Sequence, residues 1–552
     1  MCGIFGIICE NSDKVNYDNF LETDESMREI AYRRSGAQRH RGPDHTGIFI
    51  YKENGVALLQ ERLAVMGGKK GDQPFFSDDG EIILVANGEI YNYHAVAAQL
   101  AITRKEYTPR NDCDVILGLY EEYGMDLLKY LSGMFAFVIY DRKKNFVMIA
   151  RDPIGIIPFY QGRDKDGNLW VASEMKCLVE FCRDVAIFPP GHVMFGSPGK
   201  MTVDRYWKPT WEKEVPTTNV DLNLLRSKLE SAVRTHLDCD APFAALLSGG
   251  VDSSLVASIA TKLMREKDPN FRLKTFSVGL KGAPDFKYSK IVADFIGSDH
   301  EEVYFTVEEG LDCIRELIYK LETYDITTVR CGILMYILIR VIKGEGYKMV
   351  LSGEGADEIF GGYLYFHSAP SAEEFHHETV ARVKNLHLSD CLRANKCCMG
   401  WGVEPRVPFL DTEFFEHAMT IKPEDRMPIA GTKQSIEKYI LRAAFADGYL
   451  PDSVLWRQKE QFSDGVGYNW IDSIKDYAAS RITDEEFANA EEKFPFNTPA
   501  TKEAYYYRKI FTQMFPHKSC AETVMKWVPR LDWGCAADPS GRAQKLHCSN
   551  ES

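Results

Sequence analysis

The stretch FAALLSGGVDSS, residues 243–254, decides the fold of the second half of this 552-residue chain. Its apolar run at 243–247 is typical of a buried strand, and its two glycines lead into a helix expected from 253 to 264. Further elements follow in the same order: a strand at 273–278, a helix at 288–296, and strands near 303–305 and at 347–350. Strands that alternate with helices predict a parallel, doubly wound sheet.

This stretch is also suited to holding phosphate. Gly249 and Gly250 let backbone N–H groups approach an oxyanion, and the N-terminus of the following helix favours negative charge. Ser248 and Ser253 add hydroxyl donors, whereas Asp252 would repel bare phosphate and is therefore assigned to Mg²⁺. A glycine pair alone also fits an ordinary tight turn, and the ending of a Walker A loop is missing.

A second polar turn, LSGEGADE at 351–358, follows the strand at 347–350. It falls at the carboxyl edge of the same sheet, where open α/β sheets bind their ligands. Its three carboxylates either form a solvated turn or need nearby cations. Because Asp252 is predicted at the same edge, we interpret Asp252 and Asp357 as a shared Mg²⁺ site, which leaves Glu354 for substrate.

The N-terminus, MCGIFG at residues 1–6, carries a second kind of chemistry. Once Met1 is removed, Cys2 has both a thiol and a free α-amine, whose ordinary pKa of about 7.7–8.0 lets it act as a base. One residue then supplies nucleophile and base. Considered alone, Cys2 also fits a small buried apolar residue.

Three further segments bring the groups that a glutamine-hydrolysing thiol site needs: RHRGPD at 39–44, ERLAV at 61–65 and NGEIYN at 87–92. Asn87 and Gly88 follow the apolar run 82–86, so we expect them where a strand ends, as a side-chain amide and a backbone N–H that form an oxyanion hole. Arg62 suits a substrate carboxylate, and Glu89 or Asp112 suits an ammonium group. Taken singly, each residue also fits a surface ion pair or a turn.

Composition indicates a large enzyme with two or three domains, since 45% hydrophobic residues suffice for substantial cores. The net charge of −14 and the absence of a long Lys/Arg run argue against a nucleic-acid partner. Fourteen cysteines without a C-x-x-C pair predict reduced thiols and a cytoplasmic setting. The longest apolar run, 333–342, is too short to span a membrane and contains Arg340, so it predicts a buried helix.

The composition changes along the chain and predicts where the domains meet. Short strands, such as 47–51, 56–59, 134–140 and 146–150, predict packed, mainly antiparallel sheets in a domain at 2–208. Proline, threonine and charge mark a linker at 209–219. The doubly wound domain then occupies 220–535, its first helix presenting Leu222, Leu225, Leu229 and Val233 on one face, and 536–552 form a polar tail.

The N-terminal segments together resemble the N-terminal-nucleophile glutaminase domain of class II amidotransferases, and the loop at 248–254 resembles that of ATP pyrophosphatases. In this order the two are similar to the glutamine-hydrolysing asparagine synthetases, from Cys2 to about residue 542. Further matching stretches are LETYDITT at 321–328, GGYLYFH at 361–367, WGVEPRVPFLD at 401–411 and WRQKEQFSDGVGY at 456–468. The resemblance implies an α/β and α+β chain of two domains, an αββα sandwich followed by a doubly wound parallel-sheet ATP pyrophosphatase domain.

The resemblance also implies the reaction. Cys2 forms a thioester with glutamine and releases ammonia and glutamate, ATP with Mg²⁺ converts aspartate to β-aspartyl-AMP and pyrophosphate, and ammonia passes between the sites to form asparagine and AMP. The partners are therefore the small molecules glutamine, aspartate and ATP, with no nucleic acid and no membrane. A homodimer is expected from the family.

Matched position by position, the resemblance assigns three groups of residues. The catalytic group is Cys2, Asn87, Gly88, Glu354 and Lys459. The glutamine-binding group is Arg62, Leu63, Ala64, Val65, Met66, Asn87, Gly88, Glu89 and Asp112. The ATP-binding group is Leu247, Ser248, Gly249, Gly250, Asp252, Ser253, Val278, Ser352 and Gly353. The metal pair, Asp252 and Asp357, comes instead from the shared sheet edge described above.

Three residues depart from the family pattern. Arg110-Asn111 stand where many relatives have a glycine and a small hydroxyl residue, so the loop that closes over glutamine is expected to differ, and Val251 replaces a common leucine. Related amidotransferases and pyrophosphatases share one half of the chain only, and β-lactam-forming relatives lack the N-terminal cysteine. The alternatives are an adenylating amidotransferase for another carboxylic acid, or a non-catalytic nucleotide-binding regulator, which predicts erosion of Cys2, Asn87, Asp252 or Glu354.

Overall fold

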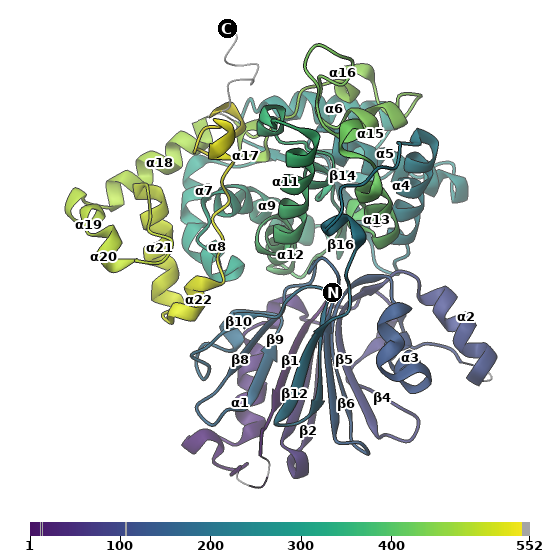
Figure 1. Ribbon diagram of the computed structural model, residues 1–552, viewed down its shortest axis with the longest axis vertical. Helices are drawn as coiled ribbons and strands as arrows, with labels where there is room; N and C mark the ends of the chain where they lie inside the picture. The colour runs from purple at the N-terminus through teal and green to yellow at the C-terminus, as the bar shows by residue number, and fades with distance from the viewer. Residues whose placement is uncertain (12, 14, 105–106, 468, 544–552) are drawn as a thin grey trace.

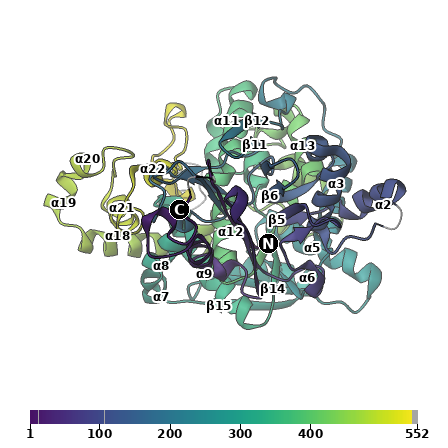
Figure 2. The same ribbon diagram turned by 90° about the horizontal axis from the view of Figure 1, so that it is seen from below.

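The computed structural model describes residues 1–552 except 12, 14, 105–106, 468 and 544–552. Part of the predicted polar tail, 544–552, therefore lies outside the described residues. Two domains lie one above the other in Figure 1, a β-rich one below and a mainly helical one above, and the N-terminus lies between them. Helices α18–α22 lie at the opposite side of the molecule from α2 and α3 in both views (Figures 1 and 2).

Two antiparallel six-stranded sheets form the first domain. The first has the order β10-β8-β9-β1-β3-β2 and the second the order β12-β11-β7-β6-β5-β4. The strands of the first sheet are β1 (Gly3–Ile8), β2 (His45–Tyr51), β3 (Val56–Arg62), β8 (Tyr160–Arg163), β9 (Leu169–Ala172) and β10 (Ala186–Ile187). Those of the second are β4 (Phe75–Phe76), β5 (Ile82–Ile90), β6 (Gly133–Asp141), β7 (Phe146–Arg151), β11 (His192–Ser197) and β12 (Lys200–Arg205).

Period-two alternation explains why these sheets stack between helices. Ile4 on β1 and Val85 on β5 belong to the core between the two sheets. Phe5, the next residue of β1, turns instead to α1 (Met27–Gly36), and Leu84 turns to the other outer layer, α2 (Tyr93–Arg104) and α3 (Val115–Tyr123). Successive side chains of a strand point to opposite faces, so both faces of each sheet are covered. The predicted αββα sandwich is confirmed.

The second domain contains a five-stranded parallel sheet with the order β15-β14-β13-β16-β17. Its strands are β13 (Phe243–Leu246), β14 (Lys274–Gly279), β15 (Asp299–Tyr304), β16 (Met349–Leu351) and β17 (Glu404–Arg406). The strand order reverses at β13, so a crevice opens between the carboxyl ends of β13 and β16. The predicted doubly wound sheet is confirmed.

Helices cover both faces of this sheet. Ala245 packs with α4 (Leu222–His236) and α5 (Val251–Lys267), whereas Ala244 packs with α8 (Ile314–Leu321) and α9 (Ile326–Gly344). The apolar run 333–342 lies in α9 as a buried helix, and among the described residues no helix is long and apolar enough to cross a membrane.

The remaining helices pack around and beyond this core. They are α6 (Pro284–Ile296), α7 (Val307–Asp312), α10 (Ala356–Ile359), α11 (Ala372–Asn385), α12 (Asp390–Met399), α13 (Thr412–Thr420), α14 (Pro423–Arg426), α15 (Tyr439–Ala444), α16 (Asp452–Leu455), α17 (Phe462–Gly465), α18 (Asn469–Arg481), α19 (Asp484–Ala488), α20 (Ala490–Lys493), α21 (Lys502–Met514) and α22 (Lys518–Glu522).

Three local expectations were wrong. The strand expected at 82–86 continues to Ile90 as β5, because its pairing with β6 extends across Asn87 and Gly88. Helix α5 begins at Val251, two residues earlier than expected. Leu222 is exposed, because α4 only begins there, while Leu225, Leu229 and Val233 are buried as predicted.

The segment between the domains contains a buried tryptophan, Trp211, that packs against the second domain. β12 ends at Arg205 and α4 begins at Leu222, and between them Trp211 is buried and donates from Nε1 to Glu416 of α13 at 2.8 Å. Its ring contacts that of Phe415 edge to face. The connection is therefore packed onto the second domain.

Candidate active sites

The Cys2 thiol lies at the start of β1, nearly buried, 3.9 Å from the carbonyl oxygen of Leu63. Its backbone N–H donates to Asn87 Oδ1 at 2.6 Å, so the nitrogen and the predicted oxyanion-hole residue are already adjacent. Burial raises the pKa of the thiol. A buried thiol of this kind needs a neighbouring base to become a thiolate.

Asn87 and Gly88 lie inside β5 rather than at its end. Asn87 is fully buried, and its amide nitrogen donates one hydrogen to Ser173 Oγ at 3.1 Å, which leaves its second hydrogen for an oxyanion. Gly88 has a φ of +152°, and a Cβ there would lie 2.0 Å from the carbonyl oxygen of Met134. Only glycine fits this point of the strand.

Arg62 ends β3, with its guanidinium turned into the loop that follows. It pairs with Asp72 at 2.5 Å and donates to the carbonyl oxygen of Met66 at 2.9 Å. Of the four residues in that loop, Leu63, Val65 and Met66 are buried, and the N–H of Ala64 donates to Asp44 at 2.8 Å. The guanidinium of Arg62 is therefore fixed by its partners, and its charge partly offsets the rise in the pKa of the Cys2 thiol that burial causes.

Glu89 and Asp112 are the two carboxylates predicted to hold an ammonium group. Glu89 pairs with Arg406 of β17 at 2.8 Å and lies 3.7 Å from the α-ammonium of Met1. Asp112 is buried and accepts from the N–H of Ile90 at 2.8 Å. The Met1 ammonium also pairs with Glu404. Burial lowers the pKa of this amine, but the negative charges of Glu404, Cys2 and Glu89 outweigh it and raise the pKa to about 11. The region therefore attracts an ammonium group.

The departure at Arg110-Asn111 supports the turn that carries Asp112. Asn111 caps it by accepting from the N–H of Asp114 at 3.1 Å, and Arg110 Nε donates to the carboxylate of Asp114 at 3.0 Å. The two residues thus supply a cap and an ion pair of their own.

The second site is a pocket at the carboxyl ends of β13, β14 and β16. Leu247, Ser248, Gly250, Asp252, Ser253, Val278, Ser352 and Gly353 line it, together with Glu354, Asp357 and Lys459. Gly249 turns the loop with a φ of +78°, and a Cβ there would lie 2.5 Å from the N–H nitrogen of Ser289. The structure therefore gathers the predicted ATP-binding residues around the crevice where the strand order reverses.

A buried lysine bridges the two carboxylates predicted to hold Mg²⁺. Lys438, fully buried, pairs with Asp252 and lies 2.8 Å from Asp357, which also pairs with Lys459 at 2.9 Å. Burial raises the pKa of Asp357, but the two lysines outweigh it and lower the pKa to about 2. Among the described residues, no group of three or more His, Cys, Asp or Glu is placed to hold a metal. Asp252 and Asp357 remain the two carboxylates predicted for Mg²⁺.

Glu354 faces Arg393 of α12, whose Nη2 lies 3.0 Å from both carboxylate oxygens. Arg393 also pairs with Asp390 at 2.7 Å. Burial raises the pKa of Glu354, and Arg393 opposes that shift. The guanidinium of Arg393 therefore helps to keep the Glu354 carboxylate ionised in this pocket.

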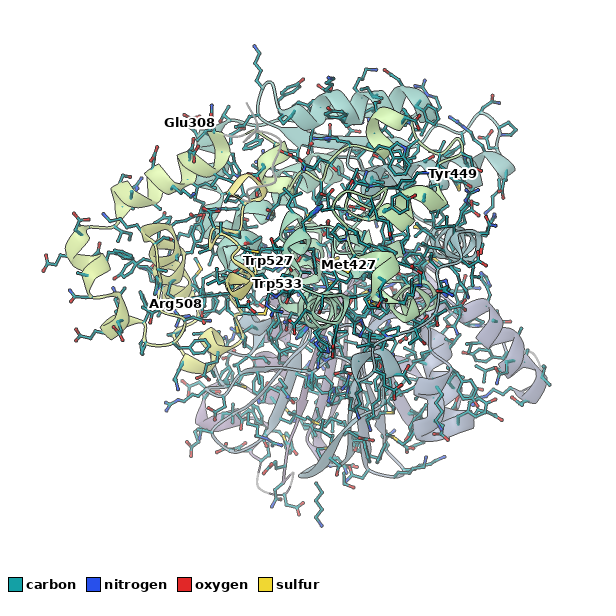
Figure 3. The ribbon with its side chains drawn as sticks, turned by 45° about the horizontal axis from the view of Figure 1, so that its top comes forward. Glu308, Met427, Tyr449, Arg508, Trp527 and Trp533 are labelled. Atoms are coloured by element: carbon teal, nitrogen blue, oxygen red, sulfur yellow. The ribbon has the colours of Figure 1, made fainter. Side chains whose placement is uncertain are left out.

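Aromatic side chains form part of the pocket lining. Trp527 lines it, and its ring meets Tyr363 edge to face at 5.1 Å between centroids. Trp533 packs onto the same aromatic cluster, and Figure 3 shows the two tryptophans next to each other.

Family comparisons cover both domains. The family described as "Glutamine amidotransferase domain" matches residues 1–187, and that described as "Asparagine synthase" matches residues 224–375 and 369–533. A "Probable asparagine synthetase [glutamine-hydrolyzing]" of Schizosaccharomyces pombe is 49% identical to this chain, covering 99% of both chains. The chain belongs to the glutamine-hydrolysing asparagine synthetases.

Other members of this family are nearly as similar. "Asparagine synthetase [glutamine-hydrolyzing] 1" of Saccharomyces cerevisiae is 46% identical over 99% of both chains. "Asparagine synthetase B [glutamine-hydrolyzing]" of Escherichia coli is 45% identical over the full length of both. The expectation of a two-domain member of this family is confirmed.

Sequence reasoning missed four residues that this member of the family places at its sites: Arg393, Glu404, Arg406 and Lys438. Glu404 and Arg406 lie within WGVEPRVPFLD, which was noticed only as a matching stretch. Lys438 has no signal of its own, because the residues just before α15 are mostly polar (TKQSIEK, 432–438) and a lysine there looks exposed. Only the fold brings it to Asp252.

Proposed function

We propose that this protein makes L-asparagine and L-glutamate from L-aspartate and L-glutamine, converting ATP to AMP and pyrophosphate. A carboxylate is stabilised by resonance and does not accept ammonia, so adenylation of aspartate must come first. Ammonia is released from glutamine at the first site and reacts with the adenylated aspartate at the second.

At the first site, removal of Met1 would turn the Cys2 nitrogen into a free amine beside Asn87. This amine takes the thiol proton, and sulfur attacks the side-chain amide carbon of glutamine. The second hydrogen of the Asn87 amide and the N–H of Gly88 stabilise the oxyanion. The C–N bond then breaks, ammonia leaves with the proton, and water hydrolyses the thioester to glutamate.

At the second site, the loop 248–254 and the start of α5 hold the pyrophosphate part of ATP. The aspartate carboxylate attacks the α-phosphorus, pyrophosphate leaves, and ammonia then displaces AMP from the resulting mixed anhydride. Lys459 neutralises charge during these steps, and Glu354 with its partner Arg393 is placed to hold or move a proton during amide formation.

The donor set fits Mg²⁺ bound with ATP. Asp252 and Asp357 are two carboxylates at one sheet edge, and Asp252 Oδ1 is buried without a hydrogen-bond partner. Bound there, Mg²⁺ would neutralise phosphate charge. Lys438, which bridges the two carboxylates, is then available to the phosphates.

The observation that supports this proposal most is where the thiol lies. Cys2 and Met1 are at the boundary between the domains, and the Met1 nitrogen contacts Glu404 of the second domain. Ammonia released at Cys2 would thus emerge against the synthetase domain. Because free ammonia in neutral water becomes non-nucleophilic ammonium, an enclosed passage between the sites is part of the proposal.

The test measures how much pyrophosphate and asparagine form from Mg-ATP and aspartate. Three reactions are compared: one without a nitrogen source, one with glutamine and one with ammonium. We expect equal amounts of both products with either nitrogen source. Cys2→Ala should abolish only the glutamine-driven reaction, since ammonium bypasses the thiol. If aspartate yields no amide from either source, the acceptor is wrong.

The setting of the enzyme is proposed on chemical grounds. A thiol nucleophile must stay reduced, which favours a cytoplasmic location. Homodimerisation is expected from the family, and sedimentation of the purified chain would test it.

A further inference from the structure

The guanidinium of Arg41 connects the thiol residue to the second domain. Its Nε donates to the carbonyl oxygen of Cys2 at 2.9 Å, and its Nη1 pairs with Glu174 at 3.1 Å. Its Nη2 donates across the domain boundary to Oδ1 of Asn395, on α12, at 2.8 Å. Arg41 is fully buried and Asn395 is 1% exposed, so no water competes for these bonds.

We infer that Asn395 is a positioning residue for the thiol site, supplied by the synthetase domain. This inference rests on the proposed function. Asn395 reaches no reacting atom, but it fixes one arm of the guanidinium whose other arm holds the peptide plane of Cys2. Both the nucleophile and the base belong to Cys2, so the orientation of this peptide sets the geometry of both.

The contact is strong enough to matter. Hydrogen bonds to charged groups are stronger than those between neutral groups, and a buried donor left without a partner loses the full benefit of hydration. Without the Asn395 oxygen, Nη2 would be free to turn toward another acceptor and carry Nε away from Cys2. A displacement of about 1 Å at a reacting group can slow catalysis about 100-fold.

Helix α12 places this contact opposite the other active site. Arg393, which faces Glu354, and Asn395 are two residues apart, about 200° around the helix. One short helix therefore contacts the aspartate-activating site on one side and the thiol site on the other. The glutaminase site is incomplete without this helix.

The test compares Asn395→Leu with Asn395→Asp, both close to asparagine in volume. Both variants lose the amide N–H that donates to the carbonyl oxygen of Ile156 at 3.5 Å and to Met1 Sδ at 2.9 Å, whereas only Asn395→Leu also loses the acceptor for Arg41. Glutamate release is measured without ATP, and ammonium-dependent asparagine synthesis is measured on the same samples. We expect Asn395→Leu to lower the glutaminase kcat at least 10-fold with KM within about 3-fold, and Asn395→Asp to keep at least a third of the wild-type kcat. Ammonium-dependent synthesis should stay within 2-fold of wild type.

Two controls separate positioning from general damage. Asn385→Leu, the same change at the end of α11 away from Arg41, should leave both activities unchanged. In an Arg41→Ala background, Asn395→Leu should have less than a 2-fold further effect, because its influence passes through Arg41.

The inference is overturned if Asn395→Leu keeps the wild-type glutaminase kcat, if Asn395→Asp is as impaired as Asn395→Leu, or if both activities fall in proportion. The wild type separates this from failure of the proposed function. If it releases no glutamate from glutamine, the proposed function has failed; if it does, the variants decide the inference alone.

Discussion

Replacing Lys438 with methionine tests how the nucleotide pocket keeps two carboxylates together. The lysine is fully buried between Asp252 and Asp357, whereas Lys459 contacts Asp357 alone. Methionine fills a similar volume without the charge, so Asp252 loses its ion pair with Lys438 while Asp357 keeps its ion pair with Lys459. Breaking a buried ion pair by removing one partner destabilises by about 3–5 kcal/mol, and the partial compensation by Lys459 favours the lower figure, about 3 kcal/mol.

That loss has a measurable size. A domain of roughly 300 residues unfolds with an entropy of about 2.1 cal/mol/K per residue, so about 3 kcal/mol corresponds to a fall of about 5 °C in Tm. Added Mg²⁺ should restore part of it, because two unbridged carboxylates become a better cation site. For a Kd of about 1 mM, Mg²⁺ at about 10 mM contributes about 1.4 kcal/mol, or about 2 °C.

Differential scanning fluorimetry over a Mg²⁺ series without nucleotide is the assay. Lys433→Met, an exposed lysine in the same loop, is the matched control and should stay within about 0.5 kcal/mol of wild type. The reasoning is refuted if Lys438→Met has the same Tm as the wild type, or if Mg²⁺ raises the Tm of both proteins equally. Either result would mean that Lys438 does not occupy the position of a cation between Asp252 and Asp357.

Three further predictions concern single side chains. Asn87→Ala should lower the glutaminase kcat about 100- to 1000-fold through loss of an oxyanion donor, with ammonium-dependent synthesis unchanged as its control. Arg393→Met should raise the pKa of Glu354 further and move the acidic limb of the ammonium-dependent pH–rate profile upward by about one unit or more; an unmoved limb would contradict this. Because the pKa of Asp357 is lowered to about 2, its stabilising contribution is present above about pH 4 and is lost as pH falls toward 2. The stability difference between wild type and Asp357→Asn, from urea titrations, should therefore shrink by about 1 kcal/mol between pH 5 and pH 3, and a constant difference would count against the lowered pKa.

The parts of the fold that periodicity controls could be predicted from the sequence. The apolar run before Ser248 became β13, and the alternation of strands with helices correctly indicated a parallel sheet. The ligand edge followed from topology, because motifs placed after two strands of such a sheet must meet at their carboxyl ends. This is why Asp252 and Asp357 were correctly expected close together.

Asn87 shows where local reasoning failed. The polar residues after 82–86 read as the end of a strand, yet β5 continues to Ile90 because β6 pairs with it across Asn87 and Gly88. Strand length depends on a partner about fifty residues away, which no local pattern contains. The site gains from this, since a residue inside a paired strand is held more firmly than one in a turn.

The docking of the two domains could not be predicted, because it depends on polar residues that a hydrophobic pattern assigns to the surface. Glu322 accepts from the N–H groups of Met175 and Lys176 across the boundary, at 2.8 and 2.7 Å, and pairs with the buried Lys396. Replacing such a buried cluster with well-packed apolar residues is often neutral or stabilising, so stability alone does not account for it. Hydrogen bonds depend on direction and distance, whereas apolar contacts do not, so this cluster favours one relative orientation of the two domains. The hydrogen bond from Arg41 to Asn395 requires the same orientation of the two domains. Docking through the Glu322 cluster would therefore also place Asn395 correctly for the thiol site.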